Sequence, residues 1–99
     1  MLTNERLQEV ITNVAPKYNI SKVYLFGSFA RGDATEESDV DIRVDGGTLR
    51  SLYDIIALRL ELEELLVRNV DIVLTKNIRE SFYERIKDDE VCIYDHAKN

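Results

Sequence analysis

Apolar residues recur along the chain with helical and strand periodicity in alternation. From Thr3, a predicted N-cap, they recur at helical spacing until Pro16. The nearly unbroken apolar run 22–26 predicts a strand that is covered on both faces and is therefore central in its sheet. The later pattern predicts a strand over 39–44, a helix from a Thr48 cap to about Arg68, a strand over 70–74, a shorter helix capped by Asn77 and a strand over 91–94. This alternation predicts an α/β fold.

The long predicted helix is apolar around much of its circumference. At 100° per residue, one apolar stripe suits the core and contains Leu49, Leu52, Tyr53, Ile56, Leu60 and Val67. A second stripe adjoins it and contains Ile55, Leu58, Leu62, Leu65 and Leu66. Two interpretations remain open for the second stripe. Either the N-terminal helix covers it, or Leu58, Leu62 and Leu65 stay exposed and dock a partner protein or a second copy of the chain.

Candidate chemistry is concentrated between residues 25 and 42. Gly27 allows a tight turn after the first strand, and Ser28 opens a short helix with a hydroxyl beside unpaired backbone N–H groups, which suits phosphate binding. Asp39 and Asp41 are two residues apart on a predicted strand and therefore project to the same side. Two carboxylates held this close favour a divalent cation such as Mg²⁺. The stretch thus suits a metal-bound nucleoside triphosphate.

The aspartate pair alone has a simpler interpretation. Asp39 and Asp41 share their side of the strand with Arg43 and Asp45, so all four side chains could form a solvated face while Val40, Ile42 and Val44 pack inward.

The spacing resembles a known signature. Gly27-Ser28, ten intervening residues and then Asp39-x-Asp41 resemble the nucleotidyltransferase superfamily related to DNA polymerase beta, and the fuller strings Gly-Ser-Phe-Ala-Arg-Gly and Ser-Asp-Val-Asp resemble its minimal nucleotidyltransferase (MNT) branch. The resemblance covers residues 22–74 and implies a mixed sheet covered by helices. It also implies a third carboxylate, which Asp71 supplies in an apolar run that we expect to be substantially buried. Arg31 is a secondary candidate for phosphate binding.

The resemblance implies a function as well. Small proteins of this type pair with a HEPN-domain ribonuclease toxin and act as its antitoxin by transferring AMP from ATP to a toxin tyrosine. Asp39, Asp41 and Asp71 would then be catalytic and would hold Mg²⁺, as two ions, while Gly27, Ser28 and Arg31 would bind the nucleotide. Two alternatives remain: a non-catalytic module that inhibits its partner by occlusion, and a small-molecule nucleotidyltransferase completed by a second subunit.

Composition limits the remaining possibilities. A chain of 99 residues predicts one domain over 1–99, in which 95–99 is a polar tail. A formal net charge of −6 argues against direct nucleic-acid binding. We expect a cytoplasmic protein, because the sequence has neither a long apolar run nor a leader-like N-terminus. The chain could also form homo-oligomers. The single Cys92 is expected to be a small buried hydrophobe without a chemical role.

Overall fold

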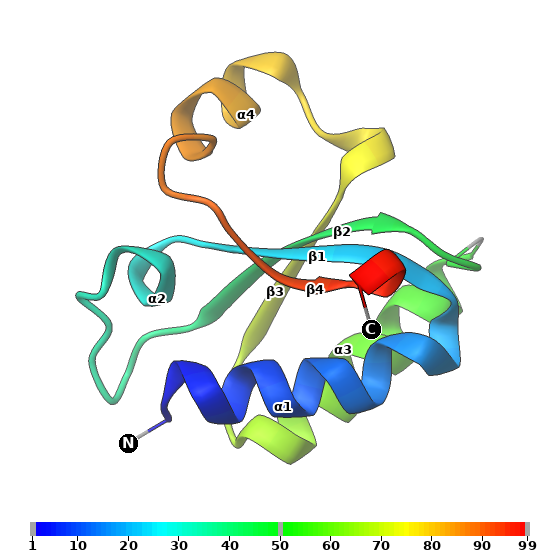
Figure 1. Cartoon of the computed structure of the whole chain (residues 1–99), viewed down its shortest axis with the longest axis horizontal. Coiled ribbons are helices and arrows are strands. Elements are labelled where there is room, and N and C mark those ends of the chain that lie inside the picture. The colour runs from blue at the N-terminus through cyan, green and yellow to red at the C-terminus, as the bar shows by residue number, and fades with distance from the viewer. Residues whose placement is uncertain (1, 50, 99) are drawn as a thin grey trace.

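The computed structural model describes residues 2–49 and 51–98, which fold around a four-stranded mixed sheet (Figure 1). The strand order is β3-β2-β1-β4; β1 is antiparallel to β2 and to β4, whereas β2 and β3 are parallel. The strands are β1 (Ile20–Phe26), β2 (Val40–Gly46), β3 (Val70–Leu74) and β4 (Val91–Asp95). The predicted α/β class and the central position of the first strand are confirmed.

Helices cover the two faces of the sheet unequally. The longer helices α1 (Asn4–Val14) and α3 (Leu52–Leu66) lie together under one face, and the short α4 (Glu80–Ile86) lies over the other (Figure 1). A single-turn helix, α2 (Ser28–Arg31), directly follows β1. Three 3₁₀ turns complete the structure: η1 (Ala15–Tyr18), η2 (Thr75–Asn77) and η3 (His96–Lys98). No helix within the two described ranges is long and apolar enough to cross a membrane.

The main core lies between the sheet and the helix pair. Alternate strand residues point into it, and one face each of α1 and α3 closes it from below. Its fully buried side chains include Leu7, Val14, Val23, Leu25, Val40, Ile42, Val44, Leu58, Leu62 and Val70. The strand residues between these point to the opposite face, where α4 lies. That opposite face carries the candidate carboxylates.

Two predicted helix starts are wrong, and those at Thr3 and Ser28 are confirmed. Thr3 caps α1, since its hydroxyl accepts a hydrogen bond from the Arg6 amide at 3.1 Å. The long helix is capped by Ser51, and Thr48 instead donates its hydroxyl to the Tyr18 carbonyl at 3.1 Å. Asn77 ends a 3₁₀ turn, and α4 begins at Glu80. In both cases the helix begins further along the chain than the predicted cap.

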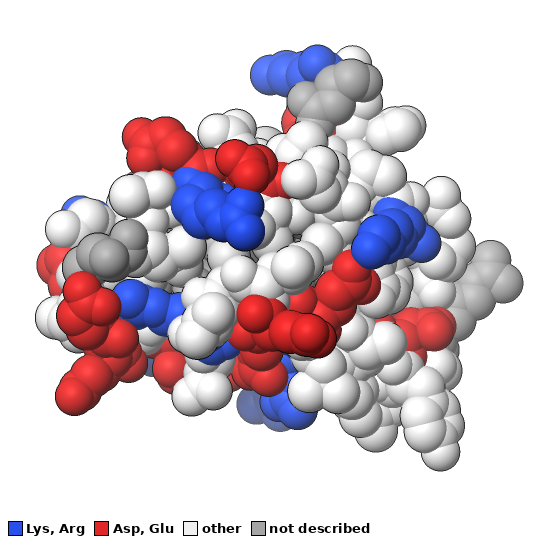
Figure 2. Space-filling view, turned by 90° about the horizontal axis from the view of Figure 1, so that it is seen from below, with Lys and Arg blue, Asp and Glu red and all other residues white. Residues whose placement is uncertain are grey.

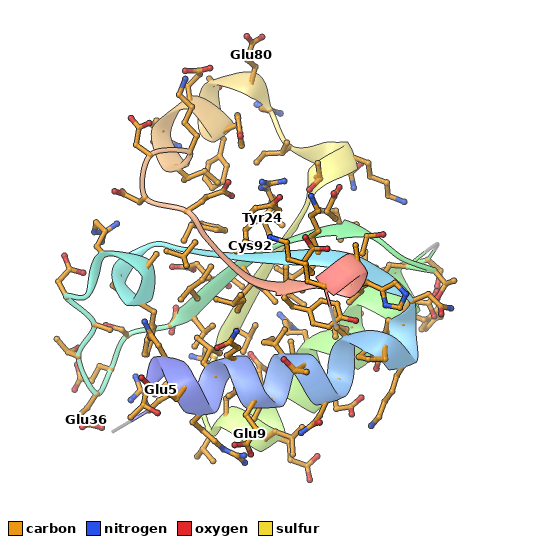
Figure 3. All side chains as sticks on the ribbon, viewed as in Figure 1. Glu5, Glu9, Tyr24, Glu36, Glu80 and Cys92 are labelled. Carbon is orange, nitrogen blue, oxygen red and sulfur yellow. The ribbon has the colours of Figure 1, made fainter. Side chains whose placement is uncertain are left out.

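The last strand also differs from its prediction. It extends to Asp95, and the expected polar tail contains the turn η3. Cys92 is exposed, because β4 is an edge strand and Cys92 lies on the α4 side of the sheet beside Tyr24 (Figure 3). Its thiol donates to the Tyr94 carbonyl at 3.4 Å.

The buried side of the long helix lies mostly along the second apolar stripe and not along the first. Leu58 and Leu62, expected in the docking alternative to be exposed, are each 1% exposed and pack in the core. Of the stripe expected in the core, Leu52, Tyr53 and Leu60 are 69%, 84% and 54% exposed. The N-terminal helix and the sheet thus cover most of the second stripe, as one of the two interpretations held, but Leu65 is 43% exposed, as the docking alternative held, and Leu49 of the first stripe is buried. The side of the molecule formed by α1 and α3 shows white areas between clusters of charged side chains (Figure 2).

Candidate active site

Two of the three candidate carboxylates are neighbours across the sheet. The parallel register of β2 and β3 pairs Asp41 with Asp71, so their side chains leave the same face of adjacent strands. Asp71 is exposed because β3 is an edge strand, and the expected burial of this residue is wrong. What brings Asp71 to the other acids is the strand register. The carboxylate pair lies at the start of both strands.

The environment of Asp41 disfavours its charged form. Burial, followed by the charge of Asp71, hydrogen bonding with Asp71 and the charge of Asp39, raises the pKa of Asp41 to about 6. The positive charge of Arg31 acts in the opposite direction on this pKa. Arg31 itself makes an exposed ion pair with Asp33, with 3.3 Å between Nε and Oδ2. The structure therefore brings Asp39, Asp71 and Arg31 within electrostatic reach of Asp41.

Gly27 leaves the space that the Asp41 carboxylate occupies. Its backbone angles, φ 74° and ψ −153°, belong to a region that side chains exclude, and a Cβ atom there would overlap Oδ2 of Asp41. Ser28 follows as the first residue of α2, and its carbonyl accepts the Gly32 and Asp33 amides at 3.0 Å each. Gly32 ends α2 in the left-handed conformation. The backbone at Gly27 thus lies directly against the Asp41 carboxylate.

The candidate carboxylates form an open acidic site for a metal ion. Among the residues that the structure describes, no three Asp, Glu, His or Cys side chains are grouped so that they alone could hold a metal ion. Asp41 and Asp71 form the adjacent pair, and Asp39 adds its charge from the residue before β2. Mg²⁺ commonly takes only one or two carboxylates and completes its shell with water and phosphate oxygens. The repelling pair beside the glycine turn fits such an ion.

The strand face that carries Asp41 is not a solvated charged surface. Arg43, two residues further on, is 7% exposed and makes a bidentate ion pair with Glu90, with Nε–Oε2 at 2.7 Å and Nη2–Oε1 at 2.9 Å. Its Nη1 donates to the Thr75 hydroxyl at 2.7 Å, and its guanidinium lies 4.1 Å from the centre of the Tyr24 ring. The simpler interpretation is therefore wrong for Arg43. A charge buried inside a strand needs such a partner, and the sequence pattern alone did not show that Arg43 is buried.

Comparison with known proteins agrees with this geometry. Residues 9–99 match the family described as Polymerase beta, Nucleotidyltransferase. The chain belongs to this nucleotidyltransferase family. Among its relatives, protein adenylyltransferase MntA of Thermococcus cleftensis is 36% identical over 83 residues, which are 80% of this chain and 84% of the relative. MJ0435 of Methanocaldococcus jannaschii, provisionally named a protein adenylyltransferase, is 35% identical over 93 residues, 94% of this chain and 99% of the relative. The chain is thus an MNT-type enzyme of the protein adenylyltransferase group.

Solved structures share the fold. A minimal nucleotidyltransferase, so named provisionally, is 32% identical with a TM-score of 0.76 and covers 91% of this chain and 95% of its own. A toxin–antitoxin complex with AMP-PNP matches at 21% identity and a TM-score of 0.75, over 98% of this chain and 77% of the other. A tri-AMPylated HEPN toxin of Shewanella oneidensis with MNT antitoxin matches at 18% identity and a TM-score of 0.66, over 96% of this chain and 71% of the other. The last two establish similarity of fold.

Proposed function

We propose that this enzyme transfers AMP from ATP, with Mg²⁺, to a tyrosine hydroxyl of a HEPN ribonuclease toxin and thereby acts as its antitoxin. The observation that carries the proposal is the pairing of Asp41 with Asp71 beside the Gly27 turn. The protein adenylyltransferase relatives favour AMP transfer to a protein. Among proteins of the same fold, one complex contains AMP-PNP and another an AMPylated HEPN toxin, which favours ATP and this class of partner.

Each site residue has a distinct role in the proposed reaction. Asp39 and Asp41 would hold Mg²⁺, and Asp71 would complete the set of ligands for two ions. When bound, the metal neutralises triphosphate charge and increases the acidity of the acceptor hydroxyl. Ser28, with the backbone amides after Gly27, would hold the terminal phosphates, and Arg31 would add positive charge. The acceptor oxygen would form a bond to the α-phosphorus as the bond to pyrophosphate breaks, and Asp71 would accept the hydroxyl proton.

The surface proposed for the toxin is the exposed apolar face of α3. Its residues Leu52 and Ile56 also line a groove of about 380 Å³ that reaches Val70 and Asp71 on the edge strand β3. A protein docked along this groove would lie beside the carboxylate that is assigned to its hydroxyl. Exposed apolar patches bordered by polar residues are typical of interaction sites. A second copy of the chain is less suitable because it would set the acidic residues Glu61, Glu63 and Glu64 of α3 against their own counterparts.

The decisive experiment incubates the purified chain with α-labelled ATP, Mg²⁺ and the HEPN protein encoded by the neighbouring gene. We expect labelled tyrosine on the HEPN protein, release of pyrophosphate and loss of ribonuclease activity. Ribonuclease inhibition without label would support occlusion instead. Label that appears only on a small hydroxyl compound, and only with a second subunit present, would support the small-molecule alternative. We also propose that the protein acts in the cytoplasm, where ATP is available.

A further inference from the structure

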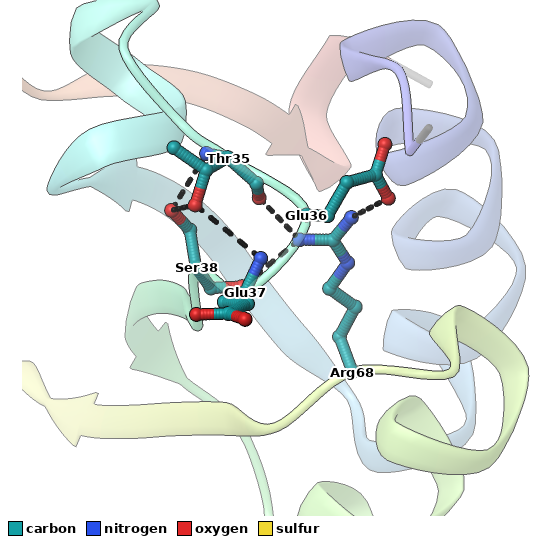
Figure 4. Close-up of polar contacts among 5 residues, drawn as sticks. All are labelled: Thr35, Glu36, Glu37, Ser38 and Arg68. Carbon is teal, nitrogen blue, oxygen red and sulfur yellow. Dashed lines mark hydrogen bonds and ion pairs between the residues drawn. The ribbon is translucent and has the colours of Figure 1, made fainter.

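The side chain of Arg68 enters the loop that leads to Asp39. Arg68 follows α3, and its side chain is only 8% exposed. Its Nη1 atom donates to the carbonyl oxygens of Thr35 at 2.8 Å and of Ser38 at 3.1 Å, and Nη2 lies 3.5 Å from Oε2 of Glu36 (Figure 4). The guanidinium also lies 5.3 Å from the centre of the buried Phe29 ring in α2. One side chain thus joins the end of α3 to the loop before β2.

The next residue holds the other side of Asp39. The carbonyl of Asn69 accepts a hydrogen bond from the Val40 amide at 2.9 Å. Asp39 therefore lies between two anchored residues: the carbonyl of Ser38 is held by Arg68, and the amide of Val40 is held by Asn69. The backbone on both sides of this carboxylate is tied to the same short connection between α3 and β3.

That connection also leads into the strand of Asp71. The Val70 amide donates to Oε2 of Glu63 at 2.9 Å, which attaches the start of β3 to α3. Asp71 is the next residue and is the register partner of Asp41. Residues 68–70 thus connect the two chain segments that carry the candidate carboxylates.

The loop itself forms a turn that does not need Arg68. The Thr35 amide donates to the Ser38 hydroxyl at 2.8 Å, and the Ser38 amide donates back to the Thr35 carbonyl at 3.1 Å (Figure 4). These bonds lie within the loop and do not attach it to α3. The planar guanidinium can reach two carbonyls, a carboxylate and a ring at the same time, whereas a lysine ammonium acts as a point charge. Loss of Arg68 would leave the turn intact but release it from the site.

We propose that Arg68 is a positioning residue that holds Asp39 in place relative to Asp41 and Asp71. The inference rests on the proposed function for its catalytic consequence, but its structural part concerns the metal-free chain alone. Residues that orient metal-binding side chains commonly affect metal affinity or activity by about 10- to 100-fold when they are replaced.

The test compares Arg68→Met, which keeps an unbranched apolar stem but removes every donor, with Arg68→Lys. Arg6→Met, at an exposed arginine of α1, is the matched control. In the metal-free protein, we expect Arg68→Met to accelerate amide exchange of Val40 about 10- to 100-fold, the range expected for loss of hydrogen bonds from a charged group, without a change in β1. In AMP transfer, we expect the half-saturating Mg²⁺ concentration to rise about 10- to 100-fold, with Arg68→Lys between wild type and Arg68→Met and Arg6→Met unchanged.

Three results would be informative in different ways. Wild-type exchange at Val40 in Arg68→Met would overturn the inference, whatever the chain transfers. Equal acceleration throughout β1 and β2, with unchanged Mg²⁺ dependence, would also overturn it, since Arg68 would then stabilise only the whole fold. Selective acceleration at Val40 in a chain that transfers no AMP would support the positioning role and contradict the proposed function.

Discussion

At the scale of single residues, the site depends on how closely Asp41 is surrounded. Gly27 lies against its carboxylate on one side, and Asp71 faces it from the neighbouring strand. Both neighbours keep the carboxylate where a cation would be held, and the same arrangement raises its pKa to about 6 in the chain without metal. At neutral pH, the charged Asp41 carboxylate therefore lowers the stability of the folded chain without metal.

Asp41→Asn should abolish AMP transfer and stabilise the metal-free protein at neutral pH. The pKa of Asp41 is raised from 3.8 to about 6, so the unfolded chain releases its proton at lower pH than the folded chain. The wild type therefore loses stability as the pH rises between about 4 and 6, and the asparagine variant avoids this loss. Melting temperatures in EDTA should diverge over this interval and stay apart above it. Asp45→Asn, on the same strand, is the control for removing one charge, and a difference that is independent of pH would contradict the assignment.

Gly27→Ala should inactivate the enzyme far more than Gly32→Ala. Both glycines have positive φ, 74° and 85°, so alanine is strained by about 1–2 kcal/mol at Gly32, which is left-handed, and by about 1–3 kcal/mol at Gly27, whose ψ of −153° is adopted almost only by glycine. Only at Gly27 would the new Cβ overlap the Asp41 carboxylate, whereas the space beside Gly32 is open. A displacement of about 1 Å in a catalytic group can reduce the rate about 100-fold. We therefore expect a loss of about that size in kcat/KM for Gly27→Ala and near-normal kinetics for Gly32→Ala, and equal kinetics in the two variants would remove Gly27 from the site.

At the scale of elements, the end of α3 carries a local strain. Val67 ends the helix in the left-handed conformation with φ 53°, and its amide donates to the Glu63 carbonyl at 2.9 Å. A β-branched residue is an outlier at this angle, where glycine is usual. The strain occurs directly before Arg68, at the connection that holds both carboxylate-bearing segments.

Val67→Gly should stabilise the protein. Glycine relieves a left-handed conformation that costs an L-residue about 1–2 kcal/mol, and little burial is lost because Val67 is 85% exposed. After the greater chain entropy of glycine in the unfolded state is subtracted, we expect a gain of about 1 kcal/mol in the free energy of unfolding. Thermal unfolding should show a rise of about 4–8 °C in a domain of this size. Val67→Ala keeps the strain, so an equal rise in that variant would show that the angle is not the cause.

At the scale of the whole molecule, the sheet separates a packing face from a chemical face. The core beneath the sheet, closed by α1 and α3, contains most of the buried side chains, and the candidate carboxylates lie on the face where α4 packs. The ion pair between Arg43 and Glu90 attaches the segment after α4 to that face. Stability and chemistry therefore depend on largely different residues.

Two lysine substitutions on α3, Leu62→Lys and Leu60→Lys, should differ strongly in their effect on stability. Leu62 is 1% exposed, so a lysine there would bury a charge in the core, and we expect it to unfold the domain or lower its melting temperature severely. Leu60 is 54% exposed, and its replacement should change the free energy of unfolding by no more than about 0.5 kcal/mol. Thermal unfolding of the two monomeric variants, followed by circular dichroism, tests both expectations. Leu60→Lys should also weaken binding of the HEPN protein, and unchanged binding would place that contact elsewhere.

The strands and the helices were largely predictable because their signals are local. The third strand has its predicted bounds, 70–74, and Thr3 caps the first helix as expected. The wrong helix starts at Thr48 and Asn77 have a shared cause, since several neighbouring polar residues could cap and only the path of the chain selects one. Arg68 could not be recognised as a site residue, because the carbonyls that it contacts lie 30 or more positions earlier in the sequence.

The sequence by itself determined the class of protein, because the spacing from Gly27-Ser28 to Asp39 and Asp41 is a covalent property of one short stretch. It also determined the kinds of elements, since side-chain periodicity follows from backbone geometry. Only the tertiary structure decided which stripe of α3 is buried, that Asp71 is exposed on an edge strand, and that Arg43 is buried against Glu90. Periodicity orders the residues around one helix or along one strand. Their burial and charge depend on which neighbours the folded chain brings against them.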